Sequence, residues 1–127
     1  MEDFKLVSLL LLIPVIVDAV GDAFRFDNRQ ILHHVMEVIH IACWVALWAA
    51  FGFDPMYIAM YILGRIVLFD ITFNLTSGLK IGYVGGSSIY DLLLRVFGGW
   101  VKQHPANFAF ITRVMALVFW VGLFIKG

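Results

Sequence analysis

Charged residues and cysteine are scarce in this sequence. Only 14% of its 127 residues are charged, against about a quarter in an ordinary soluble domain. The formal net charge is zero and there is no run of basic residues, which argues against nucleic acid as a partner. The single cysteine, Cys43, excludes a disulfide framework within the chain and any cysteine-based metal motif.

Long apolar stretches take the place of charge. The chain is 62% hydrophobic, with a mean hydropathy of +0.93. Four stretches are long enough to cross a bilayer: residues 4–20, 31–51, 55–74 and 106–125. The first could also be a signal peptide, but the acidic residues at both of its ends favour a retained helix. We therefore expect an all-α polytopic membrane protein with one domain and four transmembrane helices.

Local signals mark where some of these helices begin, bend or stop. Asp54 and Pro55 predict the start of the third span, since aspartate caps helices and proline suits their first turn. Pro14 predicts a kink in the first span. Glycines disfavour a helix over residues 75–88. Residues 89–102 then carry an apolar stripe at helical spacing that is too short to span, which predicts an amphipathic interfacial helix.

Basic residues predict the orientation of the chain. Five of them fall in the two longer loops, at Arg25, Arg29, Lys80, Arg95 and Lys102, and two fall on the opposite side, at Lys5 and Lys126. Lysine and arginine are enriched in cytoplasmic loops. We therefore expect both longer loops in the cytoplasm and both termini outside, in a bacterial inner membrane.

The stretch from residue 31 to residue 51 carries the strongest functional signal. His33, Glu37 and His40 fall within about 60° of one another on a helix, whereas His34 lies about 100° off that stripe. Ionisable groups are costly in a bilayer, so they face a partner, a water-filled cavity or a metal. The topology brings polar residues of the other spans to the same end of the bundle, namely Asp18, Asp22, Asp70, Asn74 and Arg113.

This convergence predicts a shared site whose donors suit zinc, manganese or iron. The predicted metal ligands are His33, Glu37, His40 and Asp18. The predicted catalytic groups are Asp22 and Asp70 as base or further ligand and Arg113 as oxyanion or phosphate partner. Structural ion pairing is expected among Arg65, Asp70 and Arg113. The alternative is a purely structural network, in which Glu37 pairs with Arg113 or Arg65 and His40 bonds a carbonyl group.

The glycine-rich stretch before residue 89 is a second candidate site. Backbone N–H groups of a glycine-rich turn at a helix start bind anions. This predicts a phosphate or lipid headgroup site at Lys80, Gly85, Gly86, Ser87, Ser88 and Arg95. The alternative is a capped interfacial helix that follows a loop.

Three functions are compatible with these patterns. The first is a metal-dependent hydrolase or transferase that acts on a lipid or lipid-phosphate, with membrane lipid as its partner. The second is a transporter coupled to protons or cations, in which Glu37 or Asp70 carries the charge and the chain forms a homo-oligomer. The third is a structural or accessory membrane subunit, whose polar residues only lock helices together.

Two segments resemble a group of small bacterial and phage-associated integral membrane proteins. The first runs from Gly64 to Leu75 and places Arg65 and then Phe69-Asp70 late in a span. The second runs from Tyr83 to Asp91 and contains Tyr-x-Gly followed by serines. The resemblance covers roughly a quarter of the chain. It implies a membrane protein and carries over no activity.

Overall fold

The computed structural model describes residues 2–80, 93, 96 and 105–127, which contain helices and no strands. The helices are α1 (Glu2–Leu10), α2 (Leu12–Phe26), α3 (Gln30–Phe51), α4 (Pro55–Thr76) and α6 (Pro105–Lys126). Four segments are long and apolar enough to cross a membrane, with α1 and α2 together forming the first. The all-α polytopic architecture is therefore confirmed. The expected interfacial helix, residues 89–102, lies outside the described residues apart from Leu93 and Val96.

Pro14 explains why the first span is divided into α1 and α2. Proline has no N–H group, so Pro14 gives no hydrogen bond to the carbonyl of Leu10, and its ring crowds that carbonyl. The regular helix stops at Leu10 and resumes at Leu12, while the Leu11 N–H still donates to Val7 O at 2.8 Å. The proline therefore interrupts the helix without ending the span.

The first span continues to Phe26, whereas the sequence analysis ended it at residue 20. Gly21 and Ala23 in the added part are buried, so packing extends the helix beyond its purely apolar stretch. The helix then closes at Asn28, which has a positive φ of 59°. The Arg29 N–H donates to Phe24 O at 2.8 Å and the Asn28 N–H to Arg25 O at 3.1 Å. This Schellman motif leaves a connection of three residues, 27–29, between α2 and α3.

The turn between α3 and α4 agrees with its sequence signals. Asp54 Oδ1 accepts a hydrogen bond from the Met56 N–H at 2.8 Å, and Pro55 occupies the first turn of α4. Gly52 has a positive φ of 74°, which glycine adopts at no steric cost. The predicted cap at Asp54 is confirmed.

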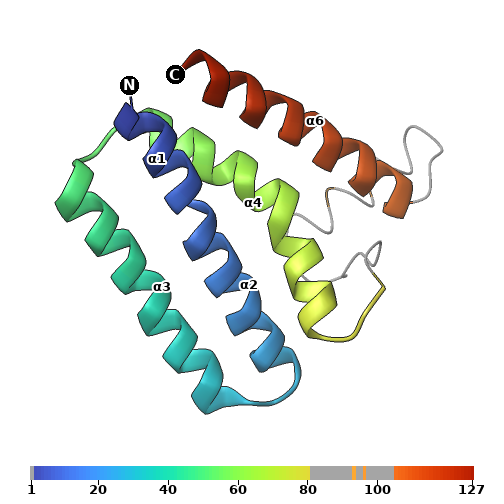
Figure 1. The fold of residues 1–127 in the computed structure, drawn as a ribbon. Coiled ribbons are helices and arrows are strands. Elements are labelled where there is room, and N and C mark those ends of the chain that lie inside the picture. The colour runs from blue at the N-terminus through green and yellow to red at the C-terminus, as the bar shows by residue number, and fades with distance from the viewer. Residues whose placement is uncertain (1, 81–92, 94–95, 97–104) are drawn as a thin grey trace.

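The first span lies at the centre of the bundle. α1 and α2 run between α3 and α4, and α6 packs against α4 (Figure 1). One face of this span is almost fully buried, at Val7, Leu11, Val15, Ala19 and Ala23, all 0–1% exposed. Their spacing of four places them along a single stripe. By contrast, α3 and α6 expose many large apolar side chains, as expected for faces that meet lipid.

Candidate functional site

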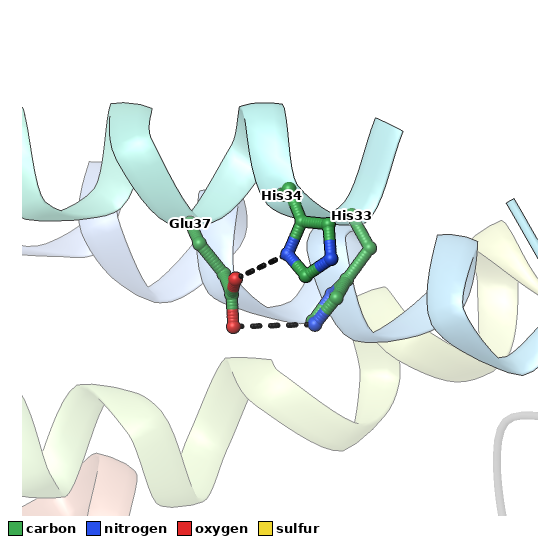
Figure 2. Close-up of side chains that lie close together, drawn as sticks. All are labelled: His33, His34 and Glu37. Carbon is green, nitrogen blue, oxygen red and sulfur yellow. Dashed lines mark hydrogen bonds and ion pairs between the residues drawn. The ribbon is translucent and has the colours of Figure 1, made fainter. Parts of the chain in front are cut away.

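Two histidines and a glutamate at the start of α3 bring their side chains together (Figure 2). Glu37 Oε1 lies 3.2 Å from His33 Nε2, and Glu37 Oε2 lies 2.9 Å from His34 Nδ1. His33, His34 and Glu37, which we call the triad, stand within the first eight residues of the helix. The triad therefore lies within about 11 Å of one end of α3.

His33 is held in place by the neighbouring helix. Its side chain is only 8% exposed, and its Nδ1 lies 2.9 Å from the carbonyl oxygen of Gly21 in α2. A carbonyl oxygen can only accept, so His33 Nδ1 carries the hydrogen and donates it. Such a bond to the second ring nitrogen orients the histidine ligands of metal sites. In contrast, the side chains of His34 and Glu37 are 69% and 52% exposed.

The contact between His33 and Glu37 needs a cation. Because His33 Nδ1 donates to Gly21, Nε2 of the neutral ring has only a lone pair to offer. That lone pair would face a carboxylate oxygen at 3.2 Å, which also only accepts. A proton between the two groups, on Nε2 or on the carboxyl group, or a metal ion shared by them removes this repulsion. The triad is therefore built to hold positive charge between His33 and Glu37.

The donor set and its dimensions suit a transition metal. Two imidazole nitrogens and one carboxylate oxygen are ligands typical of zinc and of non-haem iron. The donor atoms of the triad all lie within 4.8 Å of one another. Ligands of tetrahedral zinc are separated by roughly 3.3 Å, close to the two contacts that Glu37 makes. Three ligands would leave one or more coordination positions open for a further ligand.

His40 and Asp18, the other predicted metal ligands, belong to a different group of side chains. His40 Nε2 lies 3.3 Å from the Tyr61 hydroxyl, and His40 Nδ1 lies 3.9 Å from Asp18 Oδ1. Arg65 donates to Asp18 Oδ2 and lies over the ring of Phe69. We call Asp18, His40, Tyr61 and Arg65 the inner cluster. Asp18 lies about 12 Å from the end of α2, so the inner cluster is deeper in the bundle than the triad.

The remaining predicted residues fall in three places. Arg113 Nη2 donates to Asp70 Oδ2 at 3.2 Å across the interface between α4 and α6, which confirms that ion pair. Arg65, which was grouped with it, pairs with Asp18 instead, because α4 packs against α2. Asp22 is partly buried and follows Gly21 in α2, whose carbonyl oxygen accepts from His33. Of the predicted anion site, Lys80 is described and exposed, and the other residues lie outside the described part.

His34 and Tyr61 were missed by sequence reasoning. The signal for His34 was available, because His34 and Glu37 are three residues apart, the same spacing that suggested Glu37 and His40. Glu37 is also four residues from His33, so one long side chain reaches both histidines. Tyr61 carried no signal in the sequence, since its contact with His40 depends on how α3 and α4 pack.

Comparisons of the chain with protein-family models, with curated proteins and with solved structures gave no match.

Proposed function

We propose that this membrane protein binds a divalent transition metal at His33, His34 and Glu37. The observation that carries the proposal is the pair of contacts made by Glu37. One carboxylate faces two imidazoles, and the buried imidazole is oriented by Gly21 so that its Nε2 points at the carboxylate. A metal ion would satisfy all three donors at once.

We further propose that the metal serves a hydrolase or transferase reaction on a lipid or lipid-phosphate. The triad lies near the end of two candidate membrane spans, at the depth where we place the lipid headgroups, and two of its side chains are half-exposed or more. A metal with open coordination positions polarises a carbonyl or phosphoryl oxygen and activates water. An exposed site at this depth is therefore suited to a substrate whose reacting group lies at the membrane surface.

The inner cluster favours a second candidate function, the movement of protons. Asp18, His40 and Tyr61 form a chain of titratable groups within the bundle, and charges at such a depth often mark ion pathways. Beyond Tyr61, however, a cavity of about 410 Å³ continues towards the turn between α3 and α4 with a mostly apolar lining. Proton flux into liposomes that Asp18→Asn abolishes would favour this function over the first.

Metal analysis of variants tests the first proposal. The detergent-purified protein is loaded with Zn²⁺, Mn²⁺ or Fe²⁺, desalted, and analysed for metal by mass spectrometry. We expect close to one metal ion per chain in the wild type and a loss of that ion in His33→Ala, His34→Ala and Glu37→Ala. His40→Ala is the matched control, because it removes a histidine from the same helix but outside the triad, and it should retain the metal.

The control also separates the two possible ligand sets. Loss of metal in His40→Ala with retention in His34→Ala would replace the triad with the set of His33, Glu37, His40 and Asp18. A wild-type protein that binds none of the three metals would contradict the proposal. Circular dichroism of each variant shows whether a lost metal reflects a lost fold.

A further inference from the structure

We infer that the metal centre takes a phosphate group as its ligand, and that Arg25 is the protein group that binds this phosphate beside the metal. The inference rests on the proposed function and names its substrate class. It assigns to Arg25 the part that the sequence analysis gave to Arg113, whose side chain is 7% exposed and tied to Asp70.

The placement of Arg25 follows from the contact that orients His33. Gly21 O accepts from His33 Nδ1, so this part of α2 faces the triad. Arg25 is four residues further along α2 and therefore lies on the same face, one turn nearer the end of the helix. The guanidinium thus belongs to the surroundings of the metal centre.

Arg25 is available to bind an external anion. Its side chain is exposed, and among the described residues it has no ion pair or side-chain hydrogen bond. Arginine is the residue that best matches phosphate, because its planar guanidinium donates two parallel hydrogen bonds. A bound divalent metal outweighs the negative charge of Glu37, and Arg25 offsets that of Asp22. The loaded site is therefore net positive and open to water.

Both the metal ion and the guanidinium are positively charged, so the site favours an anionic phosphate over a neutral carbonyl group. A metal with an open position would accept one phosphoryl oxygen, and the guanidinium would bind others of the same group. Such a phosphate is present both in a lipid headgroup and in the free anion. The site lies where α2 ends and α3 begins, at one end of two candidate membrane spans, and this position favours the headgroup. The experiment distinguishes the two sources.

Calorimetric titration of the zinc-loaded protein in a non-ionic detergent tests the inference. The two probes are inorganic phosphate and dihexanoyl phosphatidic acid, a water-soluble lipid with a terminal phosphate. We expect binding that requires both Zn²⁺ and Arg25, with Arg25→Gln weakening it about tenfold or more. Lys126→Gln is the matched control, because it removes one positive charge at the opposite end of the bundle, and it should bind like the wild type. Tighter binding of the lipid identifies the headgroup as the ligand, and equal binding identifies the phosphate group alone.

The metal content of the same samples keeps the two proposals apart. A wild-type protein that holds zinc but binds neither probe would overturn this inference and leave the metal site intact. Equal phosphate affinity with and without zinc, or an Arg25→Gln variant with wild-type affinity, would also overturn it. An Arg25→Gln variant that loses stability but not phosphate binding would overturn it as well. Arg25 would then only stabilise the end of α2, as cations near a helix C-terminus do. Failure to bind zinc would instead contradict the proposed function.

Discussion

Glu37 is the residue on which the proposed metal centre depends, because each of its two oxygens contacts a different imidazole. The spacing of four between His33 and Glu37 correctly predicts that their side chains are neighbours. The helical pattern predicted His40 as the second histidine, because His33, Glu37 and His40 share one narrow stripe of the helix. His34 lies about 100° off that stripe. The glutamate side chain is long enough to contact both His33 and His34, although these two residues point in different directions from the helix.

The ion pair between Asp70 and Arg113 is largely buried, which makes it sensitive to a single substitution. Their side chains are 17% and 7% exposed, so Asp70→Asn would remove an anionic partner from a buried guanidinium. We expect a loss of about 3–5 kcal/mol in the free energy of unfolding, measured by unfolding in mixed detergent micelles.

Two further variants test that reason. The double variant Asp70→Leu/Arg113→Met should recover most of the lost stability, because it removes both charges together. Asp27→Asn, at an exposed carboxylate in the connection between α2 and α3, should change stability by less than about 0.5 kcal/mol. A similar loss in Asp27→Asn and Asp70→Asn would show that the ion pair is not the cause.

At the scale of elements, the close approach of α2 and α3 positions His33 in the triad. A Cβ atom at Gly21 would lie 3.0 Å from Met36 Cβ and 3.9 Å from His33 Nδ1. Small residues at helix interfaces allow such an approach. Gly21 therefore contributes twice, with its carbonyl as the acceptor for His33 and with its missing side chain as room for α3. The sequence did not reveal this role, because Gly21 falls one residue beyond the predicted first span, 4–20.

Gly21→Ala should weaken metal binding without touching a ligand. The added methyl group pushes α3 away and stretches the hydrogen bond that orients His33, so we expect zinc affinity to fall by about tenfold to a hundredfold. Competition with a fluorescent zinc chelator measures the change. The control is Gly122→Ala in α6, where an added Cβ would meet no atom within 4 Å. Unchanged affinity in Gly21→Ala would mean that the bond from His33 to Gly21 does not support the site.

The cap of α4 offers a test of a local sequence signal. Asp54→Ala removes the acceptor for the Met56 N–H and should cost about 1 kcal/mol of the free energy of unfolding. Asp54→Asn should cost much less, since asparagine caps helices nearly as well as aspartate. Thermal unfolding in detergent compares the two variants. Equal losses would attribute the effect to the charge of Asp54 instead of its hydrogen bond.

For the whole molecule, the sequence predicted the number of spans well and their contacts less well. Apolar length alone identified four helices, because a bilayer admits few other structures. The sequence could not identify the partner of Arg65. It placed Arg65 in the third span but did not show that this span packs against the first. The sequence also predicted one shared polar site where the structure has the triad, the inner cluster and the ion pair of Asp70 and Arg113. Position along a helix shows that residues lie at the same end of the bundle, but not which helices face each other.

The orientation in the membrane stays a prediction with a direct test. Two variants are made on a Cys43→Ser background, Asp27→Cys in the connection between α2 and α3 and Lys126→Cys at the end of α6. With four spans, the two positions lie on opposite sides. In intact bacterial cells we expect a membrane-impermeant maleimide to label position 126 only, and position 27 after permeabilisation. The reverse labelling would contradict the orientation, and labelling of both in intact cells would contradict the four spans.

X-ray absorption at the zinc edge tests the central claim most directly, because it shows the ligands of a bound ion. For the zinc-loaded wild type, the account predicts two imidazole nitrogens at about 2.0–2.1 Å with oxygen ligands at about 2.0–2.2 Å. It also predicts that both imidazoles remain in His40→Ala, whereas His34→Ala gives no zinc spectrum because it no longer retains the ion. A zinc ion without imidazole ligands, or a spectrum that changes in His40→Ala and not in His34→Ala, would contradict the metal centre at His33, His34 and Glu37.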